Sequence, residues 1–181
     1  ALLGLRGLFA VCKNVEMVFW EGKDSWAPMV EALAVIAGPN GDVLYENLFF
    51  ERQTKFQYAP TSLLPIDALS SFATPSVPIL NSINFVVLMA NAAVIAVLAT
   101  RLFVTAGDYT STSEDISGFQ CKWVVTISIA SCLAYYPLMK AFELGQIQLW
   151  YSVAFSSACL MWALNRRTAA GIAIGLAVAL K

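Results

Sequence analysis

The side chains of this sequence that are best suited to acid–base chemistry gather in one polar segment, residues 20–65, of an otherwise apolar chain. The sequence contains no histidine, which removes the commonest general base of enzymes and a frequent metal ligand. Proton transfer would therefore use a carboxylate, a lysine or a tyrosine. Because loops placed by a rigid scaffold tend to carry function, we take Asp24 as the candidate centre of the chemistry. A plainer interpretation is that Asp24 caps a following helix.

The composition indicates a membrane protein. Of the 181 residues, 59% are hydrophobic and 13% are charged, whereas a soluble domain has roughly 25% charged residues. The mean hydropathy is +0.68. The net charge of −1 offers no basic field for nucleic acid. The four cysteines form no CxxC pair and have no histidine to join them, so we predict free thiols, no metal site and no cofactor.

The polar segment is predicted to lie on the membrane surface and to contain two short helices. Residues 26–37 fit an amphipathic helix that Asp24 or Ser25 could cap, and the Gly-Pro-Asn-Gly that follows ends it. Aromatic and charged residues share the next, irregular stretch, which is typical of the lipid headgroup region. Residues 61–73 are apolar but too short to span a bilayer, so we expect an interfacial helix there.

The rest of the chain predicts an all-α, polytopic bundle of transmembrane helices that forms a single membrane domain. Residues 1–12 fit the end of a first transmembrane helix, so we expect the sequence to be a fragment of a longer protein. An external loop of residues 13–78 follows. The later spans are expected at residues 79–103, 122–139 and 147–164, with the start of a further helix at 169–181.

Charge placement predicts which side of the membrane each loop occupies. The positive-inside rule places the basic turn at Arg166 and Arg167 in the cytoplasm. Counting back from this turn, one transmembrane span at a time, puts the 13–78 loop outside, provided that the apolar residues 61–73 do not span the membrane. The turn at residues 143–146 is then outside too. Asp24 and that turn would therefore share one face of the membrane.

Several motifs along the chain together resemble a known family. They are FQYAPTSLLP at residues 56–65, YPLMKAFELGQIQLW at 136–150 and AAGIAIGLAVALK at 169–181. An acidic residue at the start of the external loop and a glycine before Leu44-Tyr45 precede them. Their order and spacing resemble glycosyltransferase family 87, integral-membrane enzymes of the GT-C architecture. Family members usually have a sequence close to Tyr-Pro-Pro where this chain has Tyr58-Ala59-Pro60.

The resemblance implies transfer of a sugar, hexosyl or mannosyl, from a polyprenyl-phosphate donor to a lipid or glycan acceptor at the outer face of the plasma (inner) membrane. The acceptor hydroxyl must lose a proton as it attacks the anomeric carbon, so an external carboxylate is needed as general base. Asp24 is the best-placed carboxylate and Glu21 is the second. The anionic leaving group needs cationic or hydrogen-bonding partners at the headgroup level. The residues that could supply such contacts are Arg52, Lys55, Tyr58, Lys140 and Gln146.

Two other functions remain open from the residues alone. A transporter or flippase-like protein would place ionisable side chains near the bilayer midplane, and a membrane assembly subunit would tolerate changes in its external loop. The candidate residues also have plainer roles. Arg52 and Lys55 fit headgroup anchors, Tyr58 belongs to a chain break before the interfacial helix, Gln146 fits a helix cap, and Glu143 fits a solvated loop charge.

Overall fold

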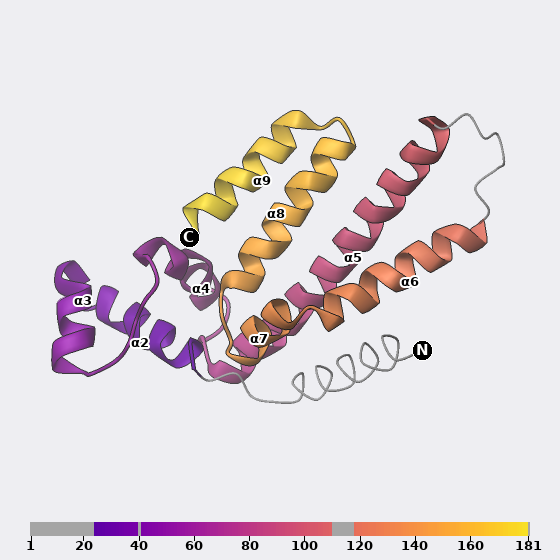
Figure 1. The fold of residues 1–181 in the computed structure, drawn as a ribbon. Coiled ribbons are helices and arrows are strands. Elements are labelled where there is room, and N and C mark those ends of the chain that lie inside the picture. The colour runs from indigo at the N-terminus through magenta and orange to yellow at the C-terminus, as the bar shows by residue number, and fades with distance from the viewer. Residues whose placement is uncertain (1–23, 40, 110–117, 181) are drawn as a thin grey trace.

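The computed structural model describes residues 24–39, 41–109 and 118–180, and every regular element in these ranges is helical (Figure 1). The all-α expectation is confirmed, while the helix expected at residues 1–12 and the candidate base Glu21 lie outside the described residues. The elements in chain order are α2 (Trp26–Ile36), η1 (Gly41–Val43), α3 (Leu44–Glu46), η2 (Asn47–Glu51), η3 (Pro60–Leu63), α4 (Leu64–Ser70), α5 (Val77–Tyr109), α6 (Gly118–Ala134), α7 (Tyr136–Glu143), α8 (Gln148–Ala163) and α9 (Arg167–Ala179).

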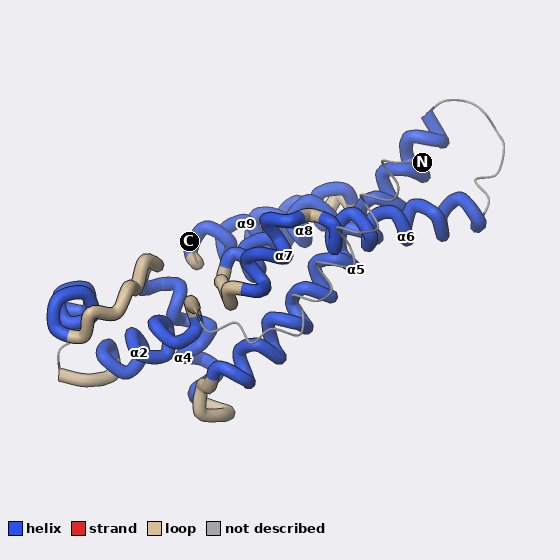
Figure 2. Tube along the Cα trace, turned by 60° about the horizontal axis from the view of Figure 1, so that its bottom comes forward, coloured by secondary structure: helices blue, strands red, loops and turns tan. Residues whose placement is uncertain are grey.

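Residues 24–76, called the surface unit below, form a small group of helices with its own apolar interior (Figures 1 and 2). Its first helix, α2, ends at Ile36, one residue before the expected end. The buried residues of α2 recur at a spacing of three, so they form a continuous stripe along the helix. The stretch after it, expected to be irregular, contains helical turns. The interior consists of Trp26, Met29, Ala32, Val35, Leu44, Leu48, Phe56, Leu63 and Ile66, joined by Leu80 of α5 and by Ile147, the N-cap residue of α8.

The longest helix of the structure is α5, with 33 residues, or about 50 Å at 1.5 Å per residue. It extends past both ends of the span expected at residues 79–103. Its Val77–Gly107 portion is the single described helix that alone is long and apolar enough to cross a membrane. Its asparagines Asn84 and Asn91 are buried. Among the described helices, α5 is therefore the clearest candidate for a membrane span.

The helix expected over residues 122–139 is two helices, α6 and α7, bent by 57°. The break falls at Tyr135, whose backbone is extended (φ −76°, ψ 97°). Pro137 follows in the first turn of α7, where its missing N–H costs little, whereas inside a continuous helix it would remove a hydrogen bond and clash with the preceding turn. The connection expected at residues 140–146 is consequently helical as far as Glu143.

The long helices pack side by side in the order α9, α8, α5 and α6 (Figure 1). A tight turn joins α8 to α9, with Asn165 in the left-handed region at φ 60°. Polar groups lie inside this bundle. Asn91 Nδ2 donates to Ser152 Oγ at 3.1 Å and Ser156 Oγ lies 2.9 Å from Asn91 Oδ1, while Trp150 Nε1 donates to Asn84 Oδ1 at 3.3 Å.

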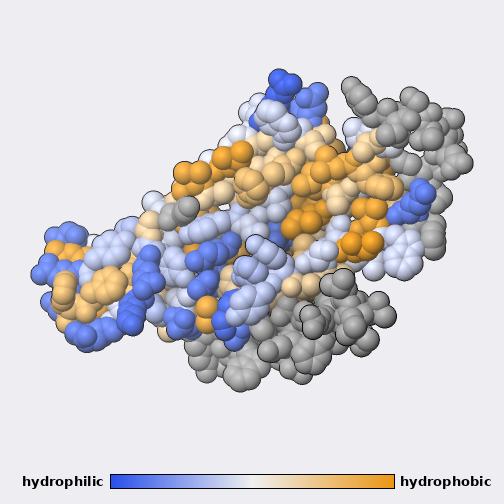
Figure 3. Space-filling view, in the orientation of Figure 1, coloured by the Kyte–Doolittle hydropathy of each residue, from blue (hydrophilic) through white to orange (hydrophobic). Residues whose placement is uncertain are grey.

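Apolar side chains cover much of the outside of the bundle. Figure 3 shows hydrophobic surface over the long helices, whereas hydrophilic surface concentrates on the surface unit and at the turn between α8 and α9. The bend at Tyr135 brings α7 down to the level of the surface unit (Figure 1). The turn after α7 therefore meets the start of α2, which is where the candidate residues converge.

Candidate functional site

Two segments far apart in the sequence are joined at the start of α2. The backbone N–H of Ser25 donates to the carbonyl oxygen of Leu144 at 3.2 Å. The Ser25 hydroxyl accepts a hydrogen bond of 3.0 Å from Tyr58 Oη. Ser25 occupies the N-cap position of α2, yet no side-chain hydrogen bond caps the helix there. The cap expected from Ser25 does not form because its side chain holds Tyr58 instead, so three chain segments meet at one residue.

Gly145 makes the close approach of these segments possible. Its φ is +63°, a left-handed conformation that side chains rarely adopt. A Cβ atom on Gly145 would lie 2.6 Å from Cδ1 and 2.7 Å from Nε1 of Trp26. Trp26 is fully buried and packs edge-on against Trp150, with ring centroids 6.4 Å apart. We call this junction of Ser25, Trp26, Tyr58, Leu144 and Gly145 the joint.

Asp24 is exposed and directly precedes the joint. On α7, the Lys140 ammonium donates to Glu143 Oε2 at 2.9 Å. The pKa of the Lys140 ammonium is raised, chiefly by its hydrogen bond with the Glu143 carboxylate. Electrostatic interactions with Tyr136 and Asp24 add smaller contributions in the same direction. Lys140 is therefore held in its protonated form by its ion pair with Glu143. Glu143, expected to be a solvated loop charge, is instead half-buried and ion-paired.

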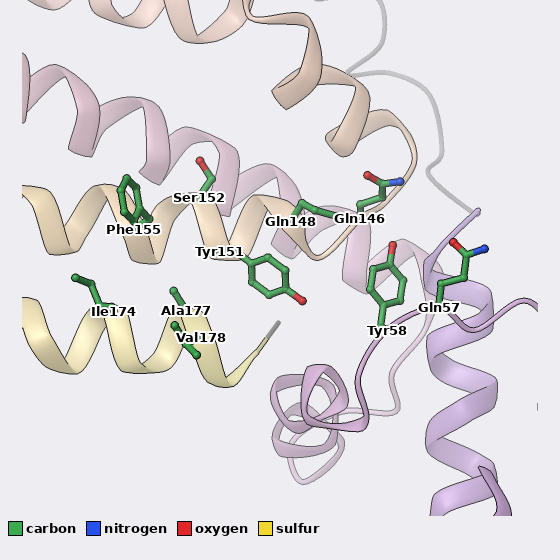
Figure 4. Close-up of a pocket in the computed structure, with 10 residues that line it drawn as sticks. All are labelled: Gln57, Tyr58, Gln146, Gln148, Tyr151, Ser152, Phe155, Ile174, Ala177 and Val178. Carbon is green, nitrogen blue, oxygen red and sulfur yellow. The ribbon is translucent and has the colours of Figure 1, made fainter. Parts of the chain in front are cut away.

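A cavity of about 800 Å³ opens beside the joint and is the size of an ordinary ligand site. Its lining changes character along its length, as Figure 4 shows. Polar side chains from the loop before η3 and from the start of α8 lie at one end, and apolar side chains of α8 and α9 lie at the other. The lining residues are Gln57, Tyr58, Gln146, Gln148, Tyr151, Ser152, Phe155, Ile174, Ala177 and Val178.

The sequence of this chain matches the model of a known protein family. The model of glycosyltransferase family 87 matches residues 56–181, most of the 181-residue chain. The chain belongs to glycosyltransferase family 87. It is therefore a glycosyltransferase, which moves a sugar from a donor to an acceptor. No curated protein matches the chain, and no solved structure matches it.

The residues that match the family 87 model include one part of the joint but not the other. Tyr58, Lys140 and Gln146 lie inside the matched residues, while Asp24 and Ser25 precede them. The structure nevertheless ties Ser25 to Leu144 and Tyr58 by hydrogen bonds. The acidic residue is thus held against matched parts of the glycosyltransferase, although it precedes the matched range itself.

The structure brings only some of the predicted site residues of this family 87 chain together. Tyr58 and Gln146 line the same cavity. Asp24 and Lys140 are not part of its lining, but Asp24 directly precedes Ser25, which is hydrogen-bonded to Tyr58. Arg52 is elsewhere. Its Nη1 atom lies 3.4 Å from Oε1 of Glu31 on the outer side of α2. Lys55 is exposed and, like Arg52, is not part of the cavity lining.

Sequence reasoning missed two residues that belong to the joint and to the cavity. Ser25 connects Asp24 to Tyr58, and its type and position signalled only a helix cap. Tyr151 lines the cavity, and its hydroxyl donates to the backbone carbonyl of Leu180 at the end of α9. A tyrosine inside an apolar run was the available signal, because a buried phenol needs a hydrogen-bond partner. Among the described residues, no group of three acidic, cysteine or histidine side chains lies together.

Proposed function

We propose that this family 87 glycosyltransferase is an integral-membrane enzyme that takes its sugar from a polyprenyl-phosphate donor. The observation that carries the proposal is the cavity beside the joint, which is polar near Tyr58 and Gln146 and apolar along α8 and α9. A lipid-linked sugar has the same two parts, a polar head and an apolar chain. The sugar and phosphate occupy the polar end, and the polyprenyl chain follows the wall formed by Phe155, Ile174 and Val178.

Asp24 acts as the general base of the transfer. It takes the proton from the acceptor hydroxyl, whose oxygen forms a bond to the anomeric carbon of the sugar. The bond from that carbon to the phosphate oxygen breaks, and polyprenyl phosphate leaves with the electron pair. Asp24 is exposed at the surface of the joint, where an acceptor can reach it. A positioned base of this kind contributes about 10²–10⁴-fold to the rate.

The remaining polar residues hold the donor. Lys140 is a cation at neutral pH and lies close enough to Asp24 for their charges to interact, so it can stabilise the phosphate as charge develops on it. Tyr58 and Gln146 offer a hydroxyl and an amide to the sugar or the phosphate. Arg52 and Lys55, which lie outside the cavity lining, contact the phosphate or the lipid headgroups where the donor enters.

The long helices form the membrane domain in this proposal. The apolar cover of the bundle and the hydrogen-bonded polar groups in its interior support it, as does the length of α5. The bent pair α6–α7 together passes the same length and composition test as α5. With Arg166 and Arg167 in the cytoplasm, the surface unit and the joint lie at the outer face. The enzyme then works at the outer surface of the plasma membrane.

The substitution Asp24→Asn in the full-length protein tests the proposal. Asparagine keeps the shape of the side chain but cannot accept the proton, so transfer from a radiolabelled polyprenyl-phosphate sugar should fall by about 10²–10⁴-fold. Asp67→Asn is the matched control, because Asp67 is an exposed carboxylate on α4 of the same surface unit. Activity of Asp24→Asn within a few fold of the control would contradict the role of Asp24.

A further inference from the structure

All three polar groups of Ser25 form hydrogen bonds. Its backbone N–H donates to the carbonyl oxygen of Leu144 at 3.2 Å, and its own carbonyl oxygen accepts from the N–H of Met29 at 3.2 Å. Its hydroxyl accepts from Tyr58 Oη at 3.0 Å. The residue is buried, with 7% of its surface exposed. Ser25 is therefore fixed in place by the end of α7, by α2 and by the loop before η3 together.

The position of Asp24 follows from that of Ser25. The peptide bond between the two residues is planar, so the Cα atom of Asp24 lies in the same plane as the Ser25 N–H group that contacts Leu144. An aspartate side chain is short and adopts few rotamers, so its carboxylate stays close to that Cα atom. Asp24 itself is exposed. An acceptor can thus reach the carboxylate, while the main chain that carries it is held at Ser25.

The hydroxyl of Ser25 also connects Asp24 to the wall of the cavity. Tyr58 lines the cavity, and it is held in turn by Tyr45, whose hydroxyl donates to the backbone carbonyl oxygen of Tyr58 at 2.7 Å. The phenol of Tyr58 has a single proton, which it donates to Ser25. The hydroxyl of Tyr58 can therefore not donate to Ser25 and to a phosphate at the same time.

We propose that Ser25 is a positioning residue, which together with Tyr58 holds the general base Asp24 at a fixed place beside the cavity. This inference rests on the proposed function, because it takes Asp24 as the base and the cavity as the donor site. In this role Ser25 contacts neither substrate. It sets the distance and direction from the carboxylate to the acceptor hydroxyl, and a misplacement of about 1 Å in such a geometry can cost about 10²-fold in rate.

Steady-state kinetics of the full-length protein test the assignment, with transfer from a radiolabelled polyprenyl-phosphate sugar as the assay. Ser25→Ala removes the acceptor of the Tyr58 proton and should lower kcat by about 10–10²-fold, with little change in the KM for the donor. Tyr58→Phe removes the same hydrogen bond and should lower kcat to a similar extent. The double variant should fall no further than the lower of the two single variants. In an Asp24→Asn background, Ser25→Ala should cause no further loss.

Ser62→Ala is the matched control. Ser62 is a buried serine of the same surface unit, and its hydroxyl has no hydrogen-bond partner among the described residues, so kcat should not change. Hydrogen–deuterium exchange adds a measurement that does not depend on turnover. Ser25→Ala and Tyr58→Phe should each speed exchange in the peptide that spans residues 25–29, whereas Ser62→Ala should not.

The outcomes separate this inference from the proposed function. A kcat of Ser25→Ala equal to that of Ser62→Ala would overturn the positioning role. Losses for Ser25→Ala and Tyr58→Phe that multiply in the double variant would overturn it too, because the two side chains would then act independently. Full activity of Asp24→Asn would instead remove Asp24 as the base, and the exchange rates would still report whether Ser25 holds the chain.

Discussion

The surface unit and the helix bundle differ in how they distribute polar and apolar side chains. In the surface unit most of the fully buried side chains are apolar, such as Trp26, Met29 and Phe56, although Ser62 is buried too and Phe50 and Phe72 are exposed. The charged Glu31 and Arg52 pair on its outside. In the bundle, polar Asn84 and Asn91 are buried, while large apolar side chains are exposed, among them Val86, Leu102, Phe155, Trp162, Ile172, Leu176 and Val178.

This difference is what the proposed membrane location predicts for each region. A water-facing fold gains free energy by hiding apolar surface, and the surface unit does so. A lipid-facing fold gains nothing from hiding it, and its helices associate through packing and polar contacts, such as the one between Asn91 and Ser152. The joint and the polar end of the cavity beside it lie at the boundary between the two regions, where a substrate with a polar head and a lipid tail would meet both.

The largest effect is expected at the joint itself, from Gly145→Ala. The new Cβ would overlap the buried indole of Trp26 at 2.6 Å, in a backbone with φ +63°. The left-handed conformation costs an alanine about 1–2 kcal/mol and the overlap adds about 1–3 kcal/mol. Melting temperature and sugar transfer should both fall. Gly171→Ala is the control, since its Cβ would meet no atom within 4 Å. Equal behaviour of the two variants would mean that the joint is not tightly packed.

A comparison of carboxylates placed at two similarly exposed positions, one in each region, tests this difference. Met89 on α5 and Val43 in the surface unit are similarly exposed, at 39% and 43%. In lipid, Met89→Asp should cost roughly 2.5–3.5 kcal/mol of insertion free energy, whereas Val43→Asp in water should cost almost nothing. Accumulation of each variant in the membrane fraction measures the difference. If both variants accumulate equally, α5 does not face lipid at Met89.

Sequence patterns predicted the elements better than the contacts between them. The end of α2 was predicted to within one residue, because Gly38-Pro39 is strong turn chemistry. The break before α7 was missed, although Pro137 signalled it, because the apolar run continues through the proline and was taken as one span. At such a position the apolar run favours one continuous helix, whereas the proline favours a break. In the structure the backbone constraint of the proline decides, and the helix is broken.

The parts of the candidate site that depend on residue type could be predicted from the sequence. The contacts that depend on how distant segments pack could not. Tyr58 and Gln146 were chosen as polar groups on one face of the membrane, and both line the cavity. The Ser25–Leu144 hydrogen bond joins backbones more than a hundred residues apart, and no local pattern encodes such a contact. The pairing of Arg52 with Glu31 likewise depends on how η2 folds back on α2.

A moderate effect is expected from removing a polar contact inside the bundle. Asn91 hydrogen-bonds both Ser152 and Ser156, so Asn91→Ala should cost about 1–2 kcal/mol, the usual worth of such contacts between membrane helices. Asn84 makes one hydrogen bond, to Trp150, and its buried Nδ2 has no partner among the described residues. Asn84→Ala should therefore cost less. Thermal unfolding in detergent compares the two, and a larger loss for Asn84→Ala would contradict this account of the interior.

The smallest effect is expected from the ion pair of Arg52 with Glu31. Both side chains are partly exposed and their atoms lie 3.4 Å apart, so Arg52→Gln or Glu31→Gln should each cost at most about 1 kcal/mol of stability, less at high salt. Their effects on transfer should differ. If Arg52 contacts the phosphate of the donor, Arg52→Gln raises the KM for the donor a few fold, whereas Glu31→Gln, which frees the guanidinium, does not raise it. Equal KM values for the two variants would leave Arg52 with a role in the surface unit alone and would make Lys140 the cation that meets the phosphate.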